Sequence, residues 1–215
     1  GIKDYIEYGY HPADKHSAAT SKTLEFAFND FALSRLAAAL GENEDAQMFA
    51  ARSMNYKNVW NPERGFFDGR NADGSFVEEF TDSAWRDVYT EGTAWQWLWF
   101  VPQDVEGLIE LMGGRENFVA RLDEFFENSH RAPDTLMYDK WYWHGNEPDI
   151  HAAYLYLWAG RPDRTQEEVR WVLFTKYDET PAGLDGNDDG GTLSAWYVFS
   201  AAGIMPIPAT NRYYI

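Results

Sequence analysis

The feature that most constrains this chain is an alternation between two kinds of apolar helical segment. In one kind, such as residues 22–40, apolar side chains occur nearly all round the expected helix, which is typical of a helix buried on most sides. In the other kind, such as residues 43–56, apolar residues lie on one side and charges on the other, as on a surface helix. Gly41 between them is a helix stop signal.

The same alternation recurs along the rest of the chain. Further segments that are apolar nearly all round occupy residues 91–101, 149–159 and 193–202. Further one-sided helices are expected at residues 104–112, 116–127 and 165–177. Strand signals are few: a small hairpin near 66–76 with an Asp-Gly turn, and the start of a strand at 211–215.

Buried helices alternating with one-sided helices predict an all-α fold, a toroid in which inner helices line an axis and outer helices cover them. An irregular helical bundle is the alternative. If each inner helix is followed by an outer helix that runs back, all inner helices point the same way. Their N-termini then gather at one end. No segment resembles a linker, so residues 1–215 are expected to form a single domain.

Charge and composition exclude several classes of function. The chain has 18 Lys and Arg against 35 Asp and Glu, a formal net charge of −17. This disfavours nucleic acid, whose phosphates must be neutralised by Lys and Arg, and anionic membrane surfaces. Cysteine is absent, which excludes disulfides, thiolate zinc sites and a thiol nucleophile. No apolar stretch approaches the roughly 18 to 20 residues of a membrane span, and no signal peptide is expected.

A polar cluster stands at the expected start of each apolar helix. The clusters are Ser21, Thr23 and Glu25; residues 89–92; residues 144–149; and residues 185–191. Capping of the helix N-termini is one interpretation. Capping requires only one short side chain, however, and four acidic clusters gathered at one end of a tryptophan-rich barrel favour a functional site.

Carboxylates beside aromatic residues indicate sugar chemistry. Glycoside hydrolysis needs one protonated acid for the leaving oxygen and one carboxylate to activate water. Glu91 suits the acid because Trp95, Trp97 and Trp99 follow it and can desolvate it, although a helix N-terminus favours the ionised form. Tryptophans near the clusters are candidate platforms for sugar rings, with core packing as the alternative: Trp85, Trp95, Trp141 and Trp143.

The fourth cluster invites comparison with metal sites. Its Asp-x-Asn-x-Asp-Gly pattern, residues 185–190, matches the opening of an EF-hand loop, but Trp196 stands where the loop requires Glu. An EF-hand is therefore not expected. Oxygen donors still suit a hard cation, calcium rather than zinc; they are Asn146, Glu147, Asp188 and Asp189. A terpene-cyclase-like enzyme is disfavoured because Asp188-Asp189 lacks a third aspartate at the required spacing.

Together these segments resemble a known family. The motifs are residues 21–25, residues 91–96, residues 144–148, and residues 186–190 followed by 194–197. They are similar, in the same order, to motifs of glycoside hydrolase family 92, whose members are exo-acting, calcium-dependent α-mannosidases that invert the anomeric centre. The resemblance implies the removal of terminal α-linked mannose, with α-1,2 linkages as the first expectation.

The resemblance also implies roles for individual residues. Glu91 is similar to the family's general acid and Asp189 to its general base. Asn146, Glu147 and Asp188 are implied as calcium ligands. Residues implied to contact substrate are Trp95, Gln96, His144, Asn187 and Trp143. Asn187 stands where some members have a second aspartate.

Family members are much longer, with an N-terminal β-sandwich and a complete six-hairpin toroid. The resemblance therefore implies that this chain is the C-terminal part of a catalytic domain, an incomplete (α/α)6 toroid. We expect it to pack against the missing N-terminal portion or another chain, in a periplasmic or secreted protein whose substrates are mannose-containing oligosaccharides. The alternative is a non-catalytic carbohydrate-binding or scaffold fragment.

Overall fold

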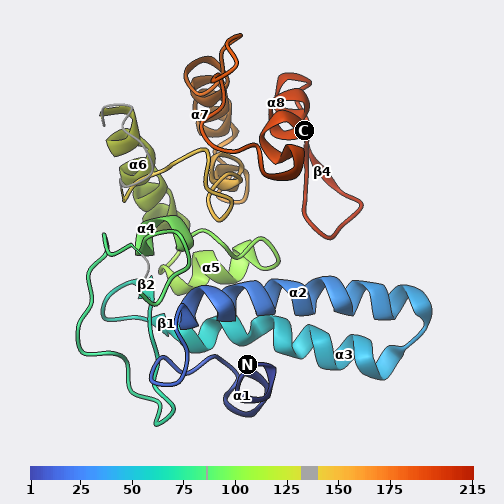
Figure 1. Ribbon diagram of the computed structural model, residues 1–215. Helices are drawn as coiled ribbons and strands as arrows, with labels where there is room; N and C mark the ends of the chain where they lie inside the picture. The colour runs from blue at the N-terminus through green and yellow to red at the C-terminus, as the bar shows by residue number, and fades with distance from the viewer. Residues whose placement is uncertain (86, 132–139) are drawn as a thin grey trace. The chain divides into compact units, whose positions relative to one another are not determined.

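The computed structural model describes residues 1–85, 87–131 and 140–215 (Figure 1). It is rich in helices, as the alternation predicts, and it divides into two compact units, residues 1–104 and residues 105–215. Each unit is built around its own helices. Among the described residues, no helix combines the length and the apolar character needed to cross a membrane.

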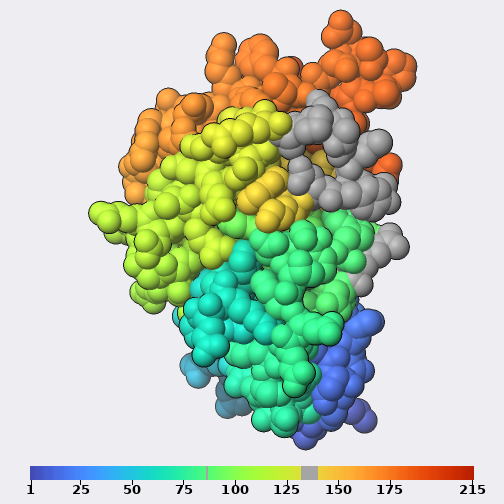
Figure 2. Space-filling view, turned by 90° about the vertical axis from the view of Figure 1, so that its left-hand side faces the viewer, coloured from blue at the N-terminus to red at the C-terminus, as the bar shows by residue number. Residues whose placement is uncertain are grey.

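Unit 1 is organised around a helical hairpin. Its elements are α1 (Ile2–Tyr8), α2 (Ala19–Leu40), α3 (Asn43–Arg52), the 3₁₀ helix η1 (Ser53–Val59), β1 (Trp60–Asn61), β2 (Phe66–Phe67) and α4 (Ala94–Trp97). Helices α2 and α3 lie side by side (Figure 1). Strand β1 pairs antiparallel with β2, with Trp60 opposite Phe67. The irregular segments between η1 and α4 form a broad face of this unit (cyan to green in Figure 2).

Helix α2 ends where its sequence predicts. Gly41 has φ 83°, a left-handed conformation that glycine adopts without a Cβ penalty, and its N–H bonds to the carbonyls of the last turn. Burial of α2 departs from the prediction, however. Its first half is largely buried, whereas Leu33, Leu36 and Leu40 are 41%, 55% and 69% exposed. The expectation of burial on most sides is therefore wrong for the second half, because the described residues do not cover that face.

The core of unit 1 joins α1, α2 and α3 through one buried carboxylate. Asp30 accepts hydrogen bonds from Arg52 over 2.8 and 3.0 Å and from the Tyr5 hydroxyl over 2.9 Å. Because charge-assisted bidentate pairs are strong and directional, this cluster sets the positions of the three helices.

Unit 2 is also mainly helical. Its elements are α5 (Val105–Leu111), α6 (Arg115–Arg131), the 3₁₀ helix η2 (Ala152–Leu157), α7 (Pro162–Thr175), the short η3 (Asp189–Gly191), α8 (Thr192–Ala201), β3 (Met205–Pro206) and β4 (Tyr213–Tyr214). Helix α7 begins with proline at its first position, where the missing N–H costs nothing.

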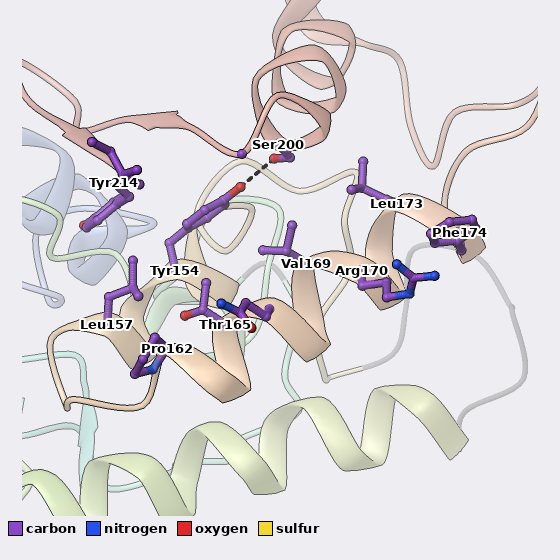
Figure 3. A pocket seen from close by; sticks show the side chains of 13 residues that line it. Tyr154, Leu157, Pro162, Thr165, Val169, Arg170, Leu173, Phe174, Ser200 and Tyr214 are labelled. Atoms are coloured by element: carbon purple, nitrogen blue, oxygen red, sulfur yellow. Dashed lines mark hydrogen bonds between the residues drawn. The ribbon is translucent and has the colours of Figure 1, made fainter.

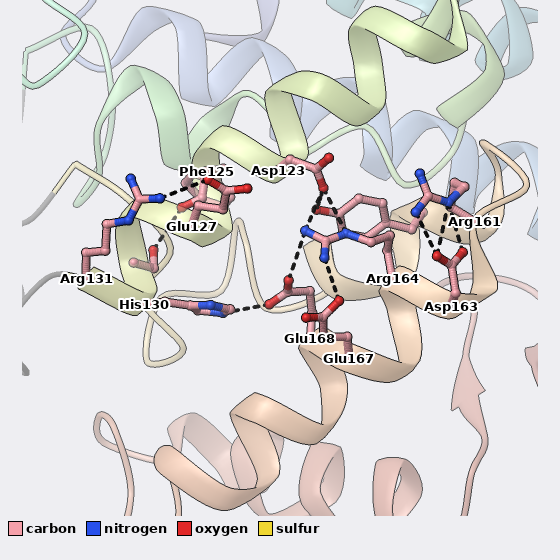
Figure 4. Close-up of polar contacts among 12 residues, drawn as sticks. Asp123, Phe125, Glu127, His130, Arg131, Arg161, Asp163, Arg164, Glu167 and Glu168 are labelled. Carbon is pink, nitrogen blue, oxygen red and sulfur yellow. Dashed lines mark hydrogen bonds and ion pairs between the residues drawn. The ribbon is translucent and has the colours of Figure 1, made fainter.

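Polar contacts fasten α6 to α7 (Figure 4). Arg164 bonds to Asp123 over 2.8 Å and to Glu167 beside it on α7. Glu168, whose side chain is 1% exposed, is paired with His130 Nε2 over 2.8 Å. A buried carboxylate without partners is costly, so Glu168 must keep its contact with His130. This requirement fixes the register between α6 and α7.

Most expected helices are present, with ends that differ by a few residues. Two are much shorter than expected. Residues 91–101 form only the four residues of α4, followed by turns, and Pro102 disfavours a helical conformation at the residue before it. Residues 149–159 form the 3₁₀ helix η2 flanked by turns, with bonds such as Ala152 N–H to the carbonyl of Asp149. The α-helical prediction is wrong there.

The expectation of a strand within 211–215 is confirmed, and that of a hairpin over 66–76 only in part, because Phe66–Phe67 pairs with Trp60–Asn61. An antiparallel bridge joins Arg70 to Phe76 around the Asp-Gly turn, and β4 within 211–215 pairs with β3. The β1–β2 hairpin was not expected from the sequence.

Candidate active site

The first two polar clusters meet in unit 1, at the start of α2. The amide of Thr90 donates to the Ser21 hydroxyl over 2.9 Å, and this hydroxyl donates in turn to Thr90 Oγ1 over 3.1 Å. The backbone adds to this contact, because the Thr20 N–H donates to the carbonyl of Val88. The two clusters therefore lie together, as the predicted helix order requires.

Glu91 follows this contact directly. It is exposed and has a left-handed backbone, φ 44°. Such a conformation costs a non-glycine residue on the order of 1–3 kcal/mol, and it persists only where neighbours determine it. Here Ser21 holds Thr90, and Trp97 Nε1 donates to the Thr90 carbonyl over 2.8 Å. These bonds fix the path of the chain at the predicted acid.

The tryptophans after Glu91 are buried. Trp95, Trp97 and Trp99 are 4%, 4% and 0% exposed, and Trp95 Nε1 donates to Asp82 over 3.0 Å. Glu91 itself is exposed. The expectation that these tryptophans surround Glu91, with Trp95 as a platform for sugar, is therefore not met within this chain. Their large apolar surface is instead buried against the interior.

Gln96, which was expected to contact substrate, is fully buried and has a structural task. Its side-chain oxygen accepts from the Thr93 N–H over 3.2 Å, while Thr93 Oγ1 accepts from the Gln96 N–H over 3.4 Å. The two residues form a capping box at the start of α4. Capping of this helix is thus done by residues that follow the second polar cluster and not by the cluster itself.

The third and fourth clusters meet in unit 2 through their backbones. A Cβ placed on Gly145 would lie 1.9 Å from the carbonyl oxygen of Asp185, and one placed on Gly186 would lie 3.0 Å from the Cα of Gly145. A distance of 1.9 Å leaves no room for any side chain. The two segments can approach this closely only because both contact positions are glycine.

The loop at residues 143–149 is closed by its own hydrogen bonds. Asn146 N–H donates to the Trp143 carbonyl over 3.0 Å, and Trp143 N–H donates to Asp149 Oδ2 over 3.2 Å. Trp143 is half-buried, Asn146 is buried and Glu147 is exposed. Asp149, which the sequence placed only at a helix start, is wholly buried, and burial raises its pKa well above the usual range.

His144 corrects a sequence-based expectation. It was expected to contact substrate, but it is 0% exposed, and its two ring nitrogens lie 2.6 and 2.5 Å from the hydroxyls of Tyr142 and Tyr177. Burial lowers its pKa from the usual 6.5 to about 3, so the ring is neutral. The sequence had not singled out either tyrosine. The only property that could have indicated these two partners is that buried tyrosines usually form hydrogen bonds through their hydroxyls.

The fourth cluster leads into α8. Asp188 Oδ1 accepts from the Ser194 N–H and Oδ2 from the Ser194 hydroxyl, each over 2.8 Å, and these bonds lower the pKa of Asp188. Asn187 and Asp189 are exposed. The backbone is left-handed at Asp188 and Asp189, with φ 62° and 33°.

Left-handed backbone thus coincides with the predicted chemistry. Among the described residues, positive φ at non-glycine positions occurs at Ala18, Glu91, Asp188, Asp189 and Ala209. Three of these had been predicted from the sequence as acid, metal ligand and base. Such conformations cluster at functional sites, where the surrounding structure maintains them. The separation of Glu91 in unit 1 from Asp189 in unit 2 stays a prediction.

Comparison with known families decides the relationship. The profile of the glycosyl hydrolase family 92 catalytic domain matches residues 1–215, the whole chain. The chain belongs to glycosyl hydrolase family 92.

Solved family 92 enzymes are similar throughout this chain. An α-mannosidase from Bacteroides thetaiotaomicron, solved in complex with mannoimidazole, is 37% identical, with a TM-score of 0.89 over 99% of this chain and 30% of its own. An inverting mannosidase from the same organism is 38% identical, with a TM-score of 0.87 over 99% and 31%. An uncharacterised secreted glycosidase from Arthroderma benhamiae is 28% identical, over 100% of this chain and 30% of its own length. This chain spans about 30% of the length of these relatives.

Calcium, expected from the family 92 resemblance, can be tested against the donor chemistry. Asn146 and Glu147 offer amide and carboxylate oxygens, the donors that calcium prefers. Asp188 already accepts two hydrogen bonds from Ser194. In the described part of the chain, no group of three or more His, Asp or Glu side chains is arranged to hold a metal. The donors present are thus of the right type, but they do not form a three-residue acidic cage.

A separate hollow in unit 2 does not fit sugar chemistry (Figure 3). This pocket of about 480 Å³ lies between η2, α7 and the end of α8. Its walls are largely apolar, with Leu157, Val169 and Leu173 among them, and the Tyr154 hydroxyl bonds to Ser200 at its edge. It contains none of the residues predicted for the site.

Proposed function

We propose that the protein containing this family 92 chain is an exo-acting α-mannosidase that inverts the anomeric centre, with α-1,2-linked mannose in oligosaccharides as its substrate. The observation that carries the proposal is the placement of Glu91 and Asp189. Both are exposed carboxylates on left-handed backbone, each beside a point where two polar clusters of its unit meet.

The division of labour follows from the chemistry of inversion. Glu91 protonates the leaving glycosidic oxygen, and Asp189 removes a proton from the water that attacks the opposite face of the sugar. Inverting enzymes hold the two carboxyl groups roughly 6.5–9.5 Å apart, which leaves space for that water. Asn187 beside the base contributes hydrogen bonds to the sugar.

Calcium is part of this proposal. Asn146, Glu147 and Asp188 would hold the ion, and a bound calcium would supply positive charge that binds mannose hydroxyls. Within this chain, the loop bonds between Trp143, Asn146 and Asp149 hold the two donor residues in place.

We also propose that the chain forms part of an (α/α)6 toroid that packs against the remainder of a longer protein. The exposed apolar residues of α2 and α8, such as Leu36 and Val198, support this arrangement, because an inner helix needs neighbours on every side. A periplasmic or secreted location is proposed from the relative named as secreted.

The test is mannoside hydrolysis by the longest available form of the protein and its variants. Glu91→Gln and Asp189→Asn should each lower kcat by about 10²–10⁴-fold, the usual contribution of a general acid or base. Melting temperatures should stay unchanged because both side chains are exposed. Glu124→Gln, on the exposed face of α6, is the matched control. The sugar first released should be the β-anomer by NMR.

The same assay tests calcium and the alternative function. A chelator should abolish activity, and calcium but not zinc should restore it. Full activity of Glu91→Gln would remove the proposed acid. Mannose binding by calorimetry without any product would favour a carbohydrate-binding fragment instead.

A further inference from the structure

A partly buried chain of hydrogen bonds in unit 2 has a direction that follows from its donors and acceptors. The Tyr177 hydroxyl donates its proton to the carbonyl of Leu193 over 2.9 Å. Toward His144 Nε2 it must therefore accept, so Nε2 carries the ring proton. On the other side of the ring, the Tyr142 hydroxyl bonds to Nδ1 over 2.6 Å.

This chain joins two segments that carry proposed site residues. At one end are Tyr142 and His144, which begin the loop of Asn146 and Glu147. At the other end is Leu193, in the first turn of α8. In the same turn, the Ser194 N–H donates to Asp188, the residue before the proposed base Asp189.

Further contacts make the connection rigid. The ring of Trp196 on α8 packs edge-on to His144 at 4.5 Å and donates from Nε1 to the carbonyl of Ile150 over 3.0 Å. Tyr177 also forms a backbone bridge with Leu184, just before the fourth cluster. The Trp196 contacts fasten α8 to the loop that contains His144. The bridge fastens the segment before the fourth cluster to Tyr177.

We infer that His144 is a positioning residue that, through Tyr177, sets the base-carrying segment 187–191 against the loop of Asn146 and Glu147. It does so without touching substrate, since it is completely buried. This inference rests on the proposed function for its catalytic consequence, but the positioning itself can be measured without turnover.

Tyr177→Phe tests the inference because it removes one hydroxyl and leaves the ring. Tyr154→Phe is the matched control: its hydroxyl also holds α8, through Ser200 Oγ at 2.7 Å, but at the far end of that helix. Amide exchange should rise at least about tenfold at Thr192 and Ser194 in Tyr177→Phe and stay unchanged there in Tyr154→Phe.

Activity provides the second readout. Tyr177→Phe should lower kcat about tenfold or more with little change in KM, while Tyr154→Phe keeps the kcat of the parent. Equal exchange and equal kcat in the two variants would overturn the inference. If the parent protein does not hydrolyse mannosides, the proposed function fails, and the exchange data still decide the positioning role.

A third test uses the unsubstituted protein and therefore does not depend on whether a variant folds. The ¹⁵N shifts of the His144 ring should show a protonated Nε2. An unprotonated Nε2 would contradict the derived direction of the chain and overturn the inference.

Discussion

The two units bring their polar clusters together by different means. In unit 1 the contact is made by hydrogen bonds, from the amide of Thr90 to the Ser21 hydroxyl and from the Thr20 N–H to the carbonyl of Val88. In unit 2 it is bare backbone, with Gly145 against the carbonyl of Asp185. A hydroxyl contact can loosen without a clash, whereas a contact between backbones admits no added atom. The proposed acid and the proposed base are therefore held with different tolerance to mutation.

Gly145→Ala should have the largest effect, because it breaks the backbone contact in unit 2. The new methyl would overlap the Asp185 carbonyl, so one of the two segments must move. We expect a loss of unfolding free energy on the order of 4 kcal/mol, in the range of diagnostic core changes, measured by urea denaturation. Gly160→Ala is the control in the same unit, since nothing lies within 4 Å of its Cβ position. It should cost only the roughly 1–2 kcal/mol of a left-handed backbone. Equal losses would mean that the contact between Gly145 and Asp185 tolerates an added methyl group, against the comparison of the two units.

His11→Phe sharpens the comparison through pH, because each unit buries one neutral histidine. His144 bonds through both nitrogens, whereas Nδ1 of His11 is buried without a hydrogen-bond partner. Burial lowers the pKa of His11 from 6.5 to about 4. The unfolded chain therefore binds a proton first as the pH falls, and stability is lost between pH 6.5 and 4. At pH 5 this loss is about 2 kcal/mol relative to neutral pH. Denaturation at pH 7 and pH 5 should show that His11→Phe removes most of it; an unchanged pH dependence would contradict the prediction.

Ser21→Ala should have the smallest effect, because it removes the side-chain hydrogen bonds of the contact in unit 1 and leaves its backbone bonds in place. A typical net cost is about 1 kcal/mol. Ser34→Ala on the same helix is the control, since the Ser34 hydroxyl bonds only to the carbonyl of Phe31 within α2. Thermal unfolding should show similar small losses for both, while kcat falls several-fold in Ser21→Ala alone. A drop in kcat for Ser34→Ala of the same size would show that stability, not the contact with Thr90, is responsible.

Much of the fold could be predicted from periodicity. The one-sided patterns fixed α3, α5, α6 and α7 because amphipathic spacing is a local property, and Gly41 marked the end of α2 for the same reason. The secondary structure of the aromatic segments at 91–101 and 149–159 was harder to predict. Their patterns do not reveal that interior packing and Pro102 leave only a single short helical turn in the first and a 3₁₀ helix in the second.

The candidate site divides in the same way. Glu91, Asp188 and Asp189 could be proposed from motif and position, and each lies on left-handed backbone. Gln96 and His144 were assigned to substrate, but the structure buries both in hydrogen bonds with Thr93, Tyr142 and Tyr177. A residue's type shows what it can bond to, but its partner depends on segments far away in the chain.

The sequence by itself determined the helical class, the acidic character and the family of this protein, because these follow from local pattern and residue type. Only the tertiary structure decided which polar residues face solvent and which serve the interior. That decision depends on burial, since a polar group removed from water must bond to whatever lies beside it, and neighbours such as Gly145 and Asp185 become neighbours only on folding.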